Sequence, residues 1–102
     1  MVTGYARQKV NGGKLISVRL VFDLEISKIE ILGDFFMHPE EGLADIENSL
    51  IGMQINKNVE QVANIISRVT MENNIEMIGV TPVAIATTIN MAIKNGMANN
   101  KP

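Results

Sequence analysis

Apolar and polar residues alternate along the first third of the chain, and alternation with a period of two is typical of a half-buried β-strand. The clearest run spans residues 14–23, where every second position is apolar: Ile16, Val18, Leu20 and Phe22. The positions between them include Ser17 and Arg19. This pattern predicts a strand in a sheet that is covered mainly on one side.

Two further strands are expected on either side of this run. Residues 3–10 form a plausible first strand, and the alternation of Ile29 and Ile31 with polar neighbours predicts a third strand ending at about Leu32. Asn11-Gly12-Gly13 separates the first two and tolerates the positive φ angles that a tight hairpin needs. The three strands are therefore predicted to form an antiparallel meander.

After the strands the apolar period changes to about 3.6, which predicts helices. The first turn of a helix is predicted at Pro39, Glu40 and Glu41. The backbone N–H that proline lacks would have no intrahelical partner there, and carboxylates favour the positive end of the helix dipole. A buried stripe follows at helical spacing: Leu43, Ile46 and Leu50.

A second helix is expected to begin at Asn58, which forms a capping-box pattern with Gln61. Its apolar stripe is Val59, Val62, Ala63, Ile66 and Val69. Asn73 and Asn74 are expected to end it, and residues 75–80 are either a short extended segment or a loop.

The last helix is predicted from Thr81 as N-cap and Pro82 at the first helical position. Ile85, Ile89 and Ile93 would form its buried stripe, and Gly96 is expected to terminate it. The predicted fold class is α+β, with a small antiparallel meander of about three strands packed against about three helices. One domain is expected over residues 1–96, followed by a flexible C-terminal tail at 97–102.

Composition narrows the possible functions. The chain has 102 residues, a size that suits one compact domain, and nine basic against eleven acidic residues give a net charge of −2 without a basic cluster. Nucleic acid is therefore not an expected partner. Cysteine is absent, which excludes disulfides, thiolate nucleophiles and cysteine-ligated clusters. We find no secretion signal and no long apolar run, so we expect a cytoplasmic protein without membrane attachment.

Candidate catalytic or ligand-binding residues are few. His38 is the only histidine, so a metal site with two histidine ligands is excluded. A catalytic triad is not indicated either, because no nucleophile and acid partners for this histidine can be recognised in the sequence. Glu41 and Asp45 are four residues apart and can be an acid–base pair, a cation site or, more simply, a solvated acidic helix face. Asn11-Gly12-Gly13 lacks the pattern of a phosphate-binding loop and is better interpreted as a hairpin turn. No catalytic constellation is predicted.

The segment Gly33-Asp34-Phe35-Phe36, directly after the third strand, contains two of the three phenylalanines. Such a segment can anchor the connection from sheet to helix, with Asp34 accepting hydrogen bonds from backbone donors in the turn. It can also present an aromatic anchor to a partner chain. We therefore select Gly33, Asp34, Phe35 and Phe36 as the candidate motif or partner-interface residues.

Residues 11–18 (NGGKLISV) and 26–36 (ISKIEILGDFF) together resemble the C-terminal accessory domain of lipoate–protein ligases. In that family a glycine-led strand, a second hairpin and a strand ending in Gly-Asp-Phe precede helices, and the resemblance covers nearly the whole chain. The turn at Asp23-Leu24-Glu25 departs from the family pattern because it lacks the glycine often found there.

The resemblance implies a non-catalytic accessory subunit of a two-chain ligase, a heterodimer with the catalytic subunit. ATP, magnesium and lipoate would bind the catalytic partner, which forms lipoyl-adenylate and passes the lipoyl group to the acceptor domain of a 2-oxoacid dehydrogenase or glycine-cleavage protein. Since the chain starts at Met1 just before its first strand, a separately encoded subunit is expected. This chain by itself would bind no cofactor and no metal.

Two other function classes are considered. Iron–sulfur scaffold proteins have small α+β domains of similar plan, but their chemistry uses cysteine. An independent small-molecule binding or regulatory module requires no motif and stays open as the alternative.

Overall fold

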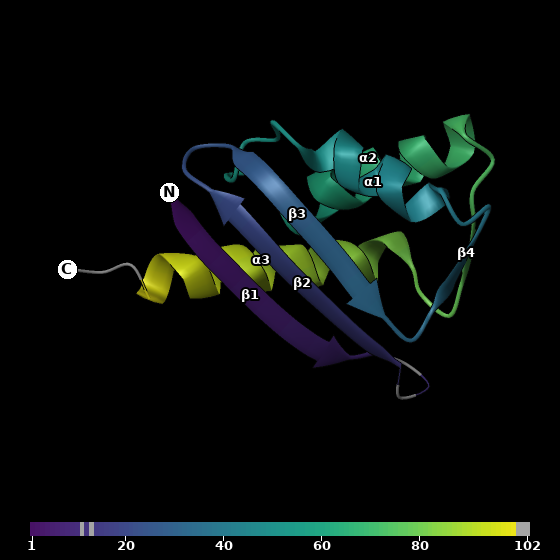
Figure 1. Cartoon of the computed structure of the whole chain (residues 1–102), viewed down its shortest axis with the longest axis horizontal. Helices are drawn as coiled ribbons and strands as arrows, with labels where there is room; N and C mark the ends of the chain where they lie inside the picture. The colour runs from purple at the N-terminus through teal and green to yellow at the C-terminus, as the bar shows by residue number, and fades with distance from the viewer. Residues whose placement is uncertain (11, 13, 100–102) are drawn as a thin grey trace.

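The computed structural model describes residues 1–10, 12 and 14–99 of the chain (Figure 1). In order, its helices and strands are β1 (Val2–Lys9), β2 (Leu15–Phe22), β3 (Ile26–Gly33), β4 (Phe36–His38), α1 (Gly42–Leu50), α2 (Val59–Glu72), β5 (Glu76–Ile78) and α3 (Pro82–Asn99). This is an α+β fold, as predicted from the sequence.

The first three strands form an antiparallel sheet in the order β1-β2-β3. The predicted meander is thus confirmed. β1 and β2 lie within one residue of their predicted limits, and β3 ends one residue after its predicted end. The backbone N–H of Val10 donates to the carbonyl oxygen of Lys14 at 2.8 Å and closes the first hairpin. In the predicted turn, Gly12 has a positive φ of 84°, while Asn11 and Gly13 lie outside the described residues.

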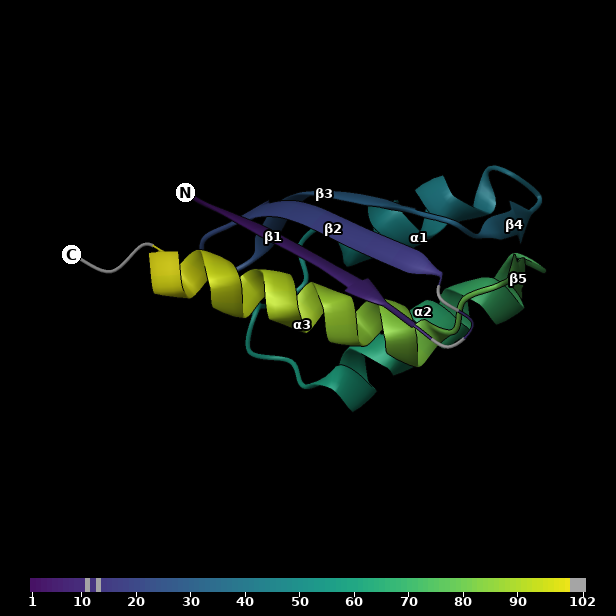
Figure 2. The ribbon, with the colours of Figure 1, turned by 90° about the horizontal axis from the view of Figure 1, so that it is seen from below.

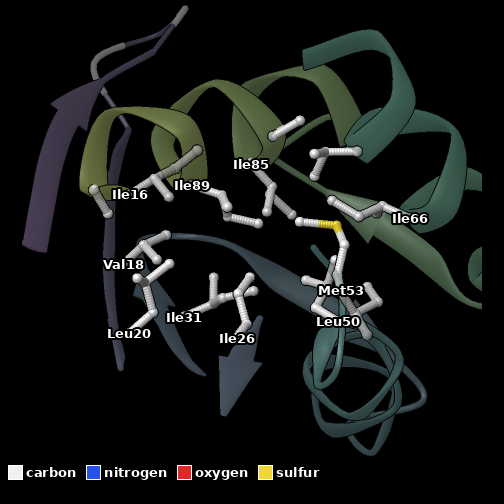
Figure 3. Packing of buried hydrophobic residues seen from close by; sticks show 14 of the residues in the cluster. Ile16, Val18, Leu20, Ile26, Ile31, Leu50, Met53, Ile66, Ile85 and Ile89 are labelled. Carbon is white, nitrogen blue, oxygen red and sulfur yellow. The ribbon is translucent and has the colours of Figure 1, made fainter. Parts of the chain in front are cut away.

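One face of this sheet is covered, because α3 lies along β1 and β2 and α2 packs on α3 (Figure 2). The alternating apolar residues of β2 are all buried, as the period-two pattern predicted. In Figure 3, Ile85 and Ile89 of α3 gather with Ile16 and Val18 of β2 in one cluster of buried side chains. Each such fully buried side chain contributes about 1.5–3 kcal/mol relative to exposure, so this layer dominates the stability of the fold.

Two glycines let β1 and α3 approach closely. A Cβ atom on Gly96 would lie 2.9 Å from Cε1 of Phe22 and 3.1 Å from the Cα of Gly4. The prediction that Gly96 ends the last helix is therefore wrong: α3 continues to Asn99, and this glycine serves close packing inside the helix. Of the predicted tail, residues 97–99 are helical and residues 100–102 lie outside the described residues.

Further along α3, a polar contact replaces this glycine contact. The side-chain amide of Gln8 on β1 donates to the hydroxyl of Thr88 at 2.6 Å, and that hydroxyl donates to the carbonyl oxygen of Ala84 at 2.8 Å. Thr88 has no exposed surface, so these hydrogen bonds satisfy a buried polar group.

The predicted start of α2 is confirmed. Asn58 and Gln61 form the complete capping box, with hydrogen bonds of 2.8 and 2.9 Å, and Asn74 after the helix adopts a positive φ of 52°. By contrast, the predicted first turn of α1 at Pro39–Glu41 is wrong. These residues form a turn in which the N–H of Gly42 donates to the carbonyl oxygen of Pro39 at 3.0 Å, and α1 begins at Gly42.

The outer edge of β3 is partly paired. Its Ile26 exchanges backbone hydrogen bonds with Gly52 and Met53 at 2.8 and 2.9 Å, and a carboxylate oxygen of Glu47 on α1 accepts the N–H of Ile31 at 2.7 Å. These contacts supply partners for backbone N–H groups of the edge strand β3 that have no neighbouring strand on that side.

The second hairpin turn needs no glycine, because an aspartate side chain organises it. The N–H of Glu25 donates to the carboxylate of Asp23 at 3.1 Å. Hydrogen bonds from the backbone N–H groups of Glu25 and Leu24 hold the pKa of Asp23 below its usual value of 3.8. The absence of a glycine at this turn is thus compensated locally.

Candidate partner interface

The four residues selected from the sequence lie at the end of β3 that leads into the β4–β5 ribbon (Figure 1). In this ribbon β4 pairs antiparallel with β5, so that Phe36 is opposite Ile78 and His38 is opposite Glu76. Residues 75–80, for which the sequence left a strand or a loop open, thus supply the second strand of the ribbon. We call this part of the molecule the ribbon end.

Gly33 is required by close packing. A Cβ atom there would clash with the carbonyl oxygen of Leu15 on β2 and would lie 2.5 Å from Cε2 of the Phe35 ring. The next residue, Asp34, donates its backbone N–H to the same carbonyl oxygen at 3.0 Å. The exit from β3 is therefore fixed by backbone contacts to β2.

The two phenylalanines have different environments. Phe35 is half-buried and packs against the hydrophobic core, whereas Phe36 is 73% exposed. Ile78, opposite Phe36 on β5, is 50% exposed. Phe35 therefore anchors the connection, and Phe36 with Ile78 forms an exposed apolar pair on the ribbon.

The backbone of Asp34 makes the hydrogen bond to Leu15, and its carboxylate accepts none from the described residues. Since Asn11 and Gly13 of the neighbouring hairpin lie outside the described residues, the expected role of this carboxylate in the turn stays a prediction. Asp34 lines a hollow of about 510 Å³ together with the other selected residues and Lys14. A Cβ atom on Gly79 would lie 3.8 Å from Cε of Lys14, which places the lysine side chain beside β5.

Two residues of this surface were missed by the sequence analysis. Ile78 lies in the segment whose structure was left open, and its pairing with Phe36 depends on a contact between residues 42 positions apart. Lys14 was predicted only as the first residue of the second strand, without a role in a site. The glycine at position 79 is the local sequence signal that the chain turns directly after β5, and in the structure it has a positive φ of 88°.

The remaining candidates lie before and at the start of α1. His38 is exposed at the end of β4, and Glu41 and Asp45 are one helical turn apart, since the N–H of Asp45 donates to the carbonyl oxygen of Glu41 at 3.0 Å. Within residues 1–10, 12 and 14–99, no group of three or more histidine, aspartate or glutamate residues is arranged to hold a metal ion. In the same residues, no helix is both long and apolar enough to cross a membrane.

Of the comparisons with known proteins, the search of solved structures is informative. No protein family matches the chain, and a search of curated proteins finds no relative. Among solved structures, the chain matches one from Thermoplasma acidophilum described as an archaeal lipoylation system, a bi-partite lipoate protein ligase and its E2 lipoyl domain. The match has 28% sequence identity and a TM-score of 0.71, and it covers 87% of this chain and 97% of the other. The chain is similar to a protein of a lipoylation system. Since both chains are covered almost completely, the similarity concerns the whole fold.

Proposed function

We propose that this chain is the non-catalytic accessory subunit of a two-chain lipoate–protein ligase, needed with the catalytic subunit for ATP-dependent formation of lipoyl-adenylate. The observation that carries the proposal is the whole-chain similarity to the archaeal lipoylation structure, at 28% identity. The resemblance of residues 11–18 and 26–36 to the ligase accessory domain, noted from the sequence, supports the accessory role rather than that of the lipoyl domain.

The catalytic subunit binds this chain at the ribbon end. Phe36 and Ile78 offer an exposed apolar pair on a short ribbon that is held rigid at Gly33, and aromatic residues on rigid supports are common interface anchors. Lys14 beside them offers a charge at the rim. ATP, magnesium and lipoate bind in the catalytic subunit.

The accessory subunit acts by favouring the closed state of its partner. Closure shields the reactive mixed anhydride from water and orders substrate loops, which raises the activation rate without a catalytic group from this chain. The accessory chain should therefore change the activation step more than the transfer step.

The test is lipoate-dependent ATP–pyrophosphate exchange by the catalytic protein of the same genome, with and without this chain. Exchange that needs both chains is the expected result. A Phe36→Ser/Ile78→Ser variant should weaken the complex at least tenfold, measured by calorimetry. The control is Leu24→Ser/Met71→Ser, which removes two apolar side chains that are 80% and 79% exposed elsewhere, and it should bind normally.

Two results would overturn the proposal. A mass increase of one lipoyl group on a lysine of this chain, with exchange unchanged by its presence, would make it the acceptor domain instead. Unchanged exchange without a complex and without modification would indicate an independent binding or regulatory module.

A further inference from the structure

The outward face of the three-stranded sheet has a charge opposite to that of the whole chain. Within the part of the chain that the structure describes, no helix covers this face, as Figure 2 shows. By strand register and alternation, its charged side chains are Arg7, Lys9, Arg19, Lys28 and Glu30. Four are basic and one is acidic, although the chain has a formal net charge of −2. The remaining surface is therefore more acidic than the chain average.

Arginine and tyrosine lie side by side on this face. Arg19 is directly opposite Tyr5 in the sheet, and its guanidinium carbon lies 5.5 Å from the centre of the tyrosine ring, where a cation–π contact holds it. Tyr5 is 46% exposed. Both residue types are enriched at protein interfaces, and here they are held in place before any partner binds.

Beside Arg19 the face is hollowed. A depression of about 400 Å³ is lined by Arg19, Lys28 and Glu30, together with apolar residues that include Val21 and Ile51. The register shift between Val21 and Phe22 lies at its edge. A β-bulge bends and twists a strand pair locally, which accounts for a hollow on an otherwise regular sheet.

This hollow is offset from the ribbon end along β3. Glu30, its lining residue nearest to that end, is three residues from Gly33, which corresponds to about 10 Å along an extended strand, and Lys28 lies two residues further away. A contact centred on Arg19 and Lys28 therefore need not cover Phe36 and Ile78.

We infer that the outward face docks an acidic surface of the lipoyl-acceptor domain, with Arg19 and Lys28 on either side of its contact. This inference rests on the proposed function, since it assigns a second partner to the same subunit. The excess of basic side chains on the face favours an acidic partner surface, and such complementarity mainly accelerates encounter and fixes orientation. The accessory subunit would thus bring the acceptor to the ligase that it also activates.

The experiment uses the complete two-chain ligase with the lipoyl domain from the same genome as acceptor. In the Arg19→Gln/Lys28→Gln variant, the KM for the lipoyl domain should rise about tenfold and its dependence on salt should weaken, while ATP–pyrophosphate exchange stays normal. The control is Arg68→Gln/Lys94→Gln, which removes one arginine and one lysine from exposed helix positions, and its KM should equal that of the wild type.

Three outcomes would overturn the inference and leave the proposed function intact. An unchanged KM in the Arg19→Gln/Lys28→Gln variant would show that the face does not dock the acceptor. A loss of exchange by this variant, with native circular dichroism, would assign the face to the catalytic subunit. Binding of the wild-type chain to phosphatidylserine vesicles or duplex DNA, lost in the variant without a change in KM, would assign it to a membrane or nucleic acid.

Discussion

At one end of the main sheet β1 runs against α3 with two glycines in contact, whereas at the other end β3 continues into a ribbon whose apolar side chains face outward. The first end, around Gly4, Phe22 and Gly96, leaves no room even for a methyl group. We call it the packed end. At the ribbon end, Phe36 and Ile78 stay exposed although the core is close by.

The difference indicates a division of roles along the sheet. Contacts between backbone atoms cannot relax, so the packed end fixes how α3 lies on the sheet. Exposed apolar residues contribute little to the stability of the isolated chain, and in the proposed complex they would be buried by the catalytic subunit. Substitutions at the two ends should therefore affect different measurements.

The largest effect is expected at the packed end, from Gly4→Ala. The added methyl group would clash with the carbonyl oxygen of Ala92 and lie 2.9 Å from its carbonyl carbon, and backbone atoms inside a helix cannot move aside. The free energy of unfolding should fall by about 3 kcal/mol, measured by urea denaturation. The control is Thr3→Ala on the exposed face of the same strand. Equal stability of Gly4→Ala and the wild type would contradict the close contact.

At the ribbon end, replacing each phenylalanine in turn separates folding from binding. Phe35→Ala should lower the free energy of unfolding by about 2 kcal/mol, less than for a fully buried ring, because Phe35 is half-buried in the core. Phe36→Ala should change it by less than about 0.5 kcal/mol, since the ring is 73% exposed. Binding to the catalytic subunit should show the reverse order, measured by calorimetry on folded protein. If Phe36→Ala destabilised the chain more than Phe35→Ala, the assignment of the two rings would be wrong.

The sequence predicted the packed layer better than the ribbon end, for a physical reason. The eight-residue strands and the capping box at Asn58 have enough periodic or local signal to be recognised. A three-residue strand such as β5 has too few alternating positions, and its pairing with β4 depends on a distant contact. The misreading of Gly96 has the same origin, because the local preference of a glycine does not reveal that Gly4 lies against it.

The sequence identified the adjacent residues of the candidate site but not the distant residues that complete its surface. The sequence placed Gly33 to Phe36 together, since they are adjacent. Which of the two rings is exposed, and that Lys14 and Ile78 join them, depends on how the hairpin and the ribbon meet in space.

At the ribbon end of β1, away from the glycine contact, Gln8 hydrogen-bonds Thr88 of α3, and a substitution there measures what this polar contact contributes to stability. Thr88→Val keeps the shape and removes the acceptor, although the Gln8 amide keeps a weaker hydrogen bond of 3.3 Å to Ala84. Unfolding should become easier by about 1 kcal/mol in urea. Thr87→Val is the control, because its hydroxyl bonds only the carbonyl oxygen of Val83 on its own helix. Equal losses in both variants would mean that the contact to β1 contributes nothing.

The smallest expected effect concerns the Asp23 turn, which joins β2 to β3 at the packed end. Hydrogen bonds from the backbone of Glu25 and Leu24 lower the pKa of Asp23 in the folded state below 3.8. The unfolded chain therefore takes up this proton first as the pH falls. The stabilisation is complete above the unfolded pKa and is lost as the pH falls through the folded one.

Asp23→Asn removes this titration while keeping an oxygen that can accept from Glu25. Between about pH 5 and pH 3, the melting temperature of the wild type should consequently fall slightly more than that of the variant, because only the wild type loses a charged acceptor in this range. Thermal unfolding followed by circular dichroism at several pH values measures the difference. Parallel pH profiles of the two proteins would show that the aspartate charge does not stabilise the turn, and the backbone contacts of Asp23 and Ile26 would then hold it.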